Sequence, residues 1–152
     1  MRILVVFYSR DGHTRRAAKI IANLLKAELD EIVDKKSRKG ILGFIKAGYD
    51  ATLGKTTEIV FRKNPSEYDI VIIGTPVWNG CITPAIRTYM MKNKENIRKF
   101  AFFATCAIEA GKCLKQMYEL FDSKSKSLLG RKVIHKGNIE KEAKEFAEGL
   151  IS

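Results

Sequence analysis

Short apolar runs alternate along this chain with stretches that have the apolar spacing of an amphipathic helix, and no other feature constrains the fold as strongly. Five runs predict strands, and several are continuous in Val, Ile or Phe, as expected of strands buried on both faces. These runs cover residues 3–8, 28–33, 69–74, 99–104 and 131–136. Strands that alternate with helices form a parallel sheet with helices on both faces, so the sequence predicts an α/β protein.

Apolar residues three and four positions apart predict the helices. The first spans residues 14–26, and the third is marked by Leu114, Met117, Tyr118 and Phe121. The second is predicted to start at Thr83-Pro84, with Thr as N-cap and Pro in the first turn, and the last to be capped by Asn138. The long connection at 34–68 is predicted to contain a short helix and then an extended piece at 57–61.

Five parallel strands in 152 residues predict one domain, residues 1–152, with the doubly wound strand order 2-1-3-4-5. In that order the winding direction reverses between the first and third strands. Ligands bind in such folds at the carboxyl ends of those two strands. The segments that follow them, residues 9–14 and 75–80, are therefore predicted to carry the chemistry.

The first of these segments joins a strand directly to a helix and predicts an anion site. Backbone N–H groups at a helix N-terminus bind anions, Gly12 permits a tight turn, and Ser9 and Thr14 can donate hydroxyl hydrogen bonds. The candidate phosphate-binding residues are Ser9, Arg10, Asp11, Gly12, His13 and Thr14.

Basic residues at the start of this helix give the same hypothesis a second basis. Cations in a first turn oppose the helix dipole, and a bound dianion would reverse the sign of that effect for His13, Arg15 and Arg16. The alternative is that Arg15 and Arg16 form a solvated face and that Ser9 or Thr14 is only a cap.

The same segment resembles the FMN phosphate loop of flavodoxins, Ser/Thr-x-Thr-Gly-x-Thr. Ser9, Gly12 and Thr14 match in register, and Asp11 stands in place of the middle Thr. The flavodoxin-type protoporphyrinogen oxidases also have an Asp-Gly-x-Thr loop. The resemblance implies a flavodoxin-like fold with flavin mononucleotide (FMN) as cofactor.

Residues 74–80 resemble the second flavin loop of flavodoxins and FMN reductases, Gly-Thr-Pro-x-x-x-Gly. The resemblance implies that Trp78 lies against the flavin ring and that Asn79 and Gly80 place amides near its redox nitrogen. The alternative for Trp78 is an ordinary half-buried aromatic. The candidate ring-binding residues are Thr75, Pro76, Val77, Trp78, Asn79 and Gly80.

The segment after the fourth strand departs from the family's third loop. It lacks the stacking Tyr common in electron-carrier flavodoxins, which would leave one face of the flavin open. By position alone, the resemblance carries over Thr105, Cys106 and Gly111.

The resemblance implies a protein that passes electrons between redox partners through FMN, with no catalytic side chain. The alternative is an FMN-dependent reductase or oxidase acting on a quinone or a protoporphyrinogen.

With 28 Lys and Arg against 17 Asp and Glu, the net charge is +11, whereas flavodoxins are usually acidic. That charge favours an acidic redox partner. The basic residues are scattered, with one cluster at Lys35, Lys36, Arg38 and Lys39, so we expect no nucleic-acid binding.

A third hypothesis comes from Cys81 and Arg87, which fit the C-x5-R-Ser/Thr loop of cysteine phosphatases. Pro84 argues against it, because it lacks an N–H where that loop must donate one.

Cys81, Cys106 and Cys113 form no C-x-x-C pair and are predicted to be buried thiols in a reducing compartment. His13 and His135 have no metal-ligand spacing, and no membrane span is predicted, so we expect a cytoplasmic protein without a metal.

Overall fold

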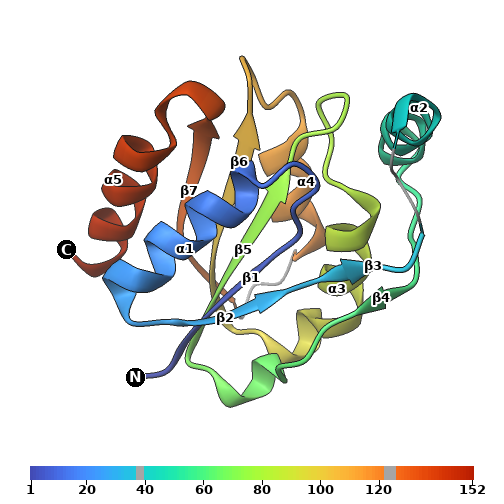
Figure 1. Ribbon diagram of the computed structural model, residues 1–152. Coiled ribbons are helices and arrows are strands. Elements are labelled where there is room, and N and C mark those ends of the chain that lie inside the picture. The colour runs from blue at the N-terminus through green and yellow to red at the C-terminus, as the bar shows by residue number, and fades with distance from the viewer. Residues whose placement is uncertain (37–39, 122–125) are drawn as a thin grey trace.

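The computed structural model describes residues 1–36, 40–121 and 126–152 (Figure 1). Arg38 and Lys39 of the predicted basic cluster lie outside the described residues. Three short 3-10 turns lie at Pro65–Glu67, Lys94–Asn96 and Lys136–Asn138. The other elements are, in chain order, β1 (Ile3–Phe7), α1 (His13–Leu25), β2 (Glu28–Glu31), β3 (Val33–Asp34), α2 (Gly40–Thr52), β4 (Ile59–Val60), β5 (Ile70–Pro76), α3 (Pro84–Asn93), β6 (Lys99–Cys106), α4 (Cys113–Leu120), β7 (Ser127–His135) and α5 (Ile139–Ile151).

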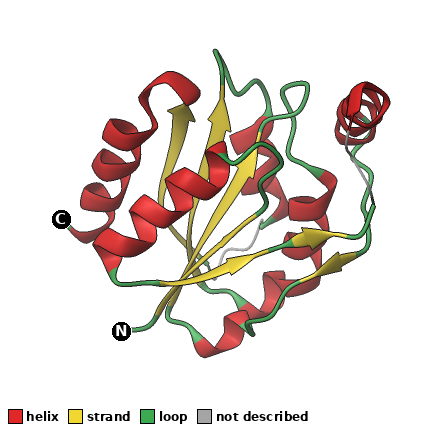
Figure 2. Ribbon diagram, in the orientation of Figure 1, coloured by secondary structure: helices red, strands yellow, loops and turns green. Residues whose placement is uncertain are grey.

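The central sheet has the order β2-β1-β5-β6-β7, and every neighbouring pair is parallel. Numbered among these strands alone, the order is 2-1-3-4-5, which confirms the predicted topology. Figure 2 shows a layer of helices on each face of the sheet, with α2 set apart from both layers. Helices α1 and α5 cover one face, and α3 and α4 cover the other.

Two apolar layers hold the helices to the sheet. Side chains alternate between the faces of a strand, so Leu4 and Val6 of β1 pack toward α3 and α4, whereas Val5 and Phe7 pack toward α1 and α5. All five residues of β1 are buried. This two-sided burial explains why the strand reads as a continuous apolar run.

The structure changes several predicted boundaries. β7 begins at Ser127, four residues before the predicted start, and β5 and β6 run on to Pro76 and Cys106. Asn138 occupies the N-cap position of α5, yet among the described atoms its side chain makes no capping hydrogen bond. Thr83 does cap α3, because its hydroxyl accepts from the Ile86 N–H at 3.4 Å.

The long connection contains more structure than predicted. Its helix, α2, has 13 residues, and its extended piece includes β4, which pairs with β3 in a separate antiparallel ladder. Residues 37–39 of this connection lie outside the described residues. Within residues 1–36, 40–121 and 126–152, no helix combines the length and apolar character needed to cross a bilayer.

A carboxylate at the start of the edge strand β2 predicts a pH-dependent stability. Hydrogen bonds from Lys63 (2.9 Å), Arg2 (3.0 Å) and Tyr68 (2.8 Å) lower the pKa of Glu28 from 4.5 to about 2. A pKa depressed by folding stabilises the protein above pH 4.5, and this stabilisation is lost as the pH falls toward 2. We expect Glu28→Gln to lower the free energy of unfolding at pH 7, with the deficit shrinking between pH 4.5 and 2.

Urea denaturation followed by circular dichroism at several pH values measures this deficit. Glu58→Gln is the control, because the Glu58 side chain is 84% exposed and its ion pair with Lys35 spans 3.7 Å. A Glu28→Gln deficit that stays constant from pH 7 to pH 2 would contradict the assignment.

Candidate functional site

A cleft of about 600 Å³ opens at the carboxyl ends of β1, β5 and β6, where the topology places ligands. The loops after these three strands line it, together with α2. Among the predicted site residues, those on the cleft are Arg10, Asp11, Pro76, Val77, Trp78, Asn79, Gly80, Thr105 and Cys106.

The loop after β1 is a tight turn into α1. Gly12 has a φ of +93°, in the left-handed region that glycine adopts without strain. The Ser9 hydroxyl oxygen accepts from the N–H groups of Gly12 (3.1 Å) and Arg15 (3.2 Å), and its own hydrogen remains available to donate. The first turn of α1, all of it described, contains no acidic residue. The positive end of this helix therefore faces the loop without a compensating carboxylate from that turn.

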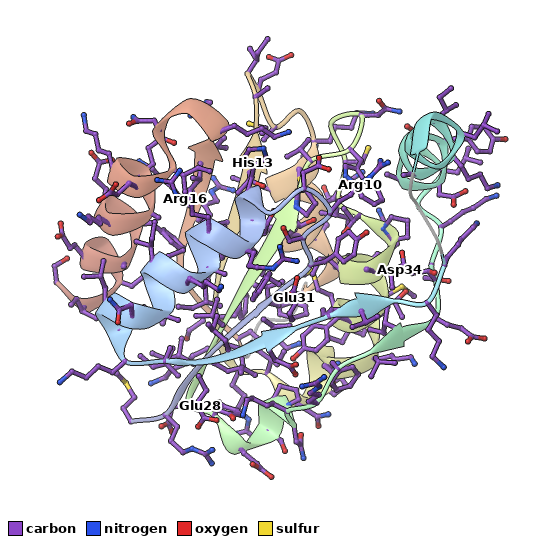
Figure 3. The ribbon with its side chains drawn as sticks, viewed as in Figure 1. Arg10, His13, Arg16, Glu28, Glu31 and Asp34 are labelled. Carbon is purple, nitrogen blue, oxygen red and sulfur yellow. The ribbon has the colours of Figure 1, made fainter. Side chains whose placement is uncertain are left out.

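The two arginines of the first turn do not take part in this site. The Arg15 guanidinium forms a forked ion pair with Glu31, with Nε at 3.0 and 3.1 Å from the two carboxylate oxygens. Arg16 extends toward α5 and lies 3.9 Å from Glu140 (Figure 3). Because protein carboxylates already balance these two arginines, their place in the first turn does not by itself indicate a bound anion.

Arg10 is the arginine of this loop that faces the cleft. Its side chain reaches toward α2, where Nη2 donates to the Gly40 carbonyl at 3.3 Å (Figure 3). His13 begins α1 and, like Gly12, is absent from the cleft lining within the described residues. Arg10 thus connects the first loop to the start of α2.

Thr14 lies in the first turn of α1 and is not among the described residues that line the cleft. It is 1% exposed, and its hydroxyl hydrogen-bonds to that of Thr105 at 2.7 Å. The bond joins the first turn of α1 to the end of β6. Thr14 is therefore a buried link between this helix and this strand, while Thr105 also lines the cleft.

The loop after β5 turns back through Asn79 and Gly80. Trp78 and Cys81 exchange two backbone hydrogen bonds of 3.0 Å each, and both central residues have positive φ, 49° and 72°. This is a type I′ turn, for which Asn-Gly is the preferred sequence. The dipeptide was a signal for the turn that the motif-based interpretation did not use.

Two residues of this loop differ in their surroundings. Trp78 is half-buried and meets Tyr8 edge to face, with ring centroids 5.6 Å apart. Thr75 is fully buried, and its hydroxyl lies 3.3 Å from that of Thr83. Thr75 supports the start of α3 and is not on the cleft.

The loop after β6, the third loop of the site, packs against the loop after β5, the second loop. At Gly111, φ is +54°, and an added Cβ would lie 2.7 Å from the Gly80 Cα. The Lys112 N–H also donates to the Gly80 carbonyl at 2.7 Å. Gly111 therefore positions the Asn79–Gly80 turn from behind instead of lining the cleft.

A partly exposed His–Glu hydrogen-bonded pair at the end of β7 holds the remainder of this loop. His135 Nδ1 is 3.0 Å from Glu142, and its Nε2 is 3.0 Å from the Ile108 carbonyl. Burial acts to raise the pKa of Glu142, but the hydrogen bonds from the His135 backbone and ring outweigh it and lower that pKa. His135 thus joins the end of β7 to α5 and to the loop after β6.

The segment from Cys81 to Arg87 does not form a phosphate cradle. The Cys81 N–H donates to Trp78, the Ile82 N–H donates to Gln116 at 3.0 Å, and α3 begins at Pro84. Cys81, Cys106 and Cys113 are buried free thiols, and burial raises the pKa of Cys106 and Cys113. These features leave the phosphatase hypothesis without its anion site.

Sequence motifs missed a part of the cleft. The cleft residues that were not predicted are Ile45, Ala47, Gly48, Ala107, Ile108, Glu109 and Lys136. The first three belong to α2, and Gly48 packs so closely on Asn79 that a Cβ there would lie 2.5 Å from Nδ2. Lys136 directly follows β7, so the shared carboxyl edge of the sheet was the signal that could have identified it.

Several solved structures with a similar architecture are flavoproteins or flavodoxins. A flavoprotein from Lactobacillus acidophilus in complex with FMN is 24% identical, with a TM-score of 0.76 over 96% of this chain and 98% of that chain. The two-electron reduced flavodoxin of Megasphaera elsdenii is 14% identical, with a TM-score of 0.64 over 97% of both chains. A WrbA-like flavodoxin from Agrobacterium tumefaciens is 17% identical, with a TM-score of 0.66 over 99% of this chain and 95% of that one.

These likenesses show that the chain has the flavodoxin-like fold. No protein-family model and no curated protein matches the sequence.

The contact between the second and third loops predicts a destabilising substitution. Gly111→Ala should lower the free energy of unfolding by about 1 to 3 kcal/mol, because the new Cβ is strained at positive φ and collides with Gly80. Chemical denaturation measures the change. Gly149→Ala, in α5 with open space around it, is the control and should be neutral or stabilising by up to about 1 kcal/mol. Equal stability of the Gly111→Ala variant and the wild type would contradict the packing described.

Proposed function

We propose that the cleft binds FMN and that the protein is an electron-transfer flavoprotein. The observation that carries this proposal is the pairing of two features at the carboxyl edge of the sheet. One is a tight loop at a helix N-terminus whose first turn contains no acid, and the other is a cleft bordered by Trp78 and the Asn79–Gly80 turn. The first suits a phosphate and the second suits a flat ring.

The residues present fit such a cofactor. The cleft volume, about 600 Å³, is within the range of small-molecule sites. Ser9 and the amides of Gly12 and His13, which flank the cleft residues Arg10 and Asp11 in the same loop, would hold the phosphate at the margin of the cleft, with Arg10 as the nearby cation. Trp78, Asn79, Gly80, Thr105 and Cys106 would surround the ring. Bound FMN supplies the one- or two-electron chemistry, so the chain needs no catalytic acid or base.

The contacts among the loops define what the protein itself contributes. The Thr14–Thr105 hydrogen bond fixes the start of α1 against the end of β6, and Gly111 fixes the third loop against the second. A ligand that touches all three loops therefore meets surfaces that are already positioned. Such preorganisation reduces the entropic cost of binding. The FMN in the similar Lactobacillus acidophilus structure supports the same cofactor for this chain.

An electron carrier is our first choice of role, with a redox protein as partner. The excess of positive charge, +11, supports an acidic partner. Three free thiols support a reducing, cytoplasmic setting.

A reductase or oxidase acting on a quinone or protoporphyrinogen is the second candidate, and one observation favours it. Residues 107–109 of the loop after β6 are all exposed, with Ile108 at 82%, and within the part of the chain that the structure describes no aromatic side chain lines the cleft on that side. A small substrate could reach a bound ring from that side.

The phosphate loop predicts a large difference between two flavins. FMN should bind the apoprotein about 100-fold or more tightly than riboflavin, because charge-assisted hydrogen bonds contribute about 1.5 to 3 kcal/mol each. Isothermal calorimetry and quenching of the Trp78 fluorescence measure both affinities. Ser9→Ala should weaken FMN about ten-fold and leave riboflavin unchanged, since it loosens only the phosphate loop.

Ser127→Ala is the matched control, because Ser127 is exposed at the amino end of β7, whereas the cleft lies at the carboxyl ends of the strands. Equal affinities for FMN and riboflavin would show that the loop does not recognise phosphate. No heat and no quenching with either flavin would reject the proposed cofactor.

Steady-state turnover separates the two roles. With FMN bound, NAD(P)H and a quinone acceptor, a carrier should oxidise NAD(P)H slowly, because it lacks a built site for the reductant and works through a protein partner. Absorbance at the NAD(P)H band follows the reaction. Rapid, saturable turnover would favour the reductase.

A further inference from the structure

Four large apolar side chains of α2 and of the residue that follows it are exposed to solvent. Leu42, Ile45, Tyr49 and Leu53 are 83%, 62%, 55% and 53% exposed. Their spacing of three and four residues places them in one stripe along the helix, here named the α2 stripe. The buried face carries Ala47, Asp50 and Ala51. A surface helix normally shows the reverse pattern, and a contiguous exposed apolar patch indicates an interaction site.

The α2 stripe begins at the rim of the cleft. Ile45 lines the cleft from α2, and the exposed Ile108 lines it from the loop after β6. Figure 1 shows α2 set apart from the helix layers that cover the sheet, above the β3–β4 ladder and close to the loop after β5. A molecule seated on the stripe would therefore lie beside the opening of the cleft.

Positive charge borders the stripe. Lys36, Lys46 and Lys55 lie 3.1, 3.4 and 3.7 Å from the carboxylate of Asp50, whose side chain is 2% exposed. Each lysine side chain is about half exposed, so three cations share one buried carboxylate. Lys46 and Lys55 also lie over the Tyr49 ring, at 5.6 and 5.4 Å from its centroid. The stripe thus has an apolar centre and a basic border.

We propose that the α2 stripe is the docking surface for an acidic redox protein that has an apolar centre to its own docking face. The inference rests on the proposed function and adds the surface through which electrons would leave the cleft. Charge complementarity selects this occupant, because an acidic border would match the lysines and steer the encounter. A second copy of this chain would bring basic border against basic border at +11 each.

Stopped-flow mixing of the reduced, FMN-loaded protein with an acidic b-type cytochrome tests the proposal, with a basic c-type cytochrome as the comparison. At low ionic strength the acidic cytochrome should be reduced faster than the basic cytochrome. The rate of its reduction should fall as salt is added. Leu42→Gln combined with Leu53→Gln should slow reduction of the acidic acceptor about ten-fold, the loss expected when apolar interface side chains are replaced. Neither leucine lines the cleft within the described residues.

Leu24→Gln combined with Met91→Gln is the matched control. Both residues are on helices, α1 and α3, are 41% and 51% exposed, and are absent from the cleft lining. This variant should react as fast as the wild type. The visible spectrum of each sample before mixing shows whether flavin is bound, so failure of the cofactor proposal is seen separately from failure of docking.

Several results would overturn the docking surface. One is equal rates for the stripe variant and the control variant with flavin bound in both, and another is a preference for the basic cytochrome. If the wild-type protein sediments with phosphatidylcholine–phosphatidylglycerol vesicles while the stripe variant does not, this result would assign the stripe to a membrane surface instead. Dimerisation lost in the same variant, measured by analytical ultracentrifugation, would assign it to a second copy.

Discussion

The arrangement of the cleft depends on how the turn between β1 and α1 is held. The Ser9 hydroxyl oxygen accepts hydrogen bonds from the N–H groups of Gly12 and Arg15, so the chain turns directly from a buried strand into a helix. The positive end of α1 then faces the carboxyl edge of the sheet. The Thr14–Thr105 hydrogen bond holds the start of α1 against the end of β6. The Gly80–Gly111 contact in turn holds the loop after β6 against the loop after β5. The proposed phosphate and ring sites are thus parts of one connected framework.

The sequence predicted the fold well because two-sided burial leaves a direct mark. Buried parallel strands such as β1 consist of consecutive apolar residues, and the strand order follows from strands alternating with helices. Edge elements were harder to predict. β7 is a half-exposed edge strand with Gly130 in its interior, and glycine is depleted in strands, so the prediction placed the start of this strand after that glycine. The short β3–β4 ladder depends on pairing between segments far apart in the sequence, which local patterns do not reveal.

The site was predicted in position but less well in detail. Motifs located the three loops, because they follow strands that meet at one edge. They could not show that Arg15 is neutralised by Glu31 of another strand, or that Thr14 faces Thr105. They predicted a short helix in the 34–68 connection but did not assign it to the site, although the apolar spacing from Leu42 to Leu53 was visible in the sequence. Contacts between distant segments decide these roles, and only the fold brings those segments together.

The most direct test of the account is a map of backbone amide chemical shifts as FMN is added to the isotope-labelled apoprotein. The account predicts the largest changes at Gly12 and His13, for the phosphate, and at Trp78, Asn79 and Gly80, for the ring. Saturable changes confined to other residues, such as the segment from Cys81 to Arg87, or no changes at all, would contradict it.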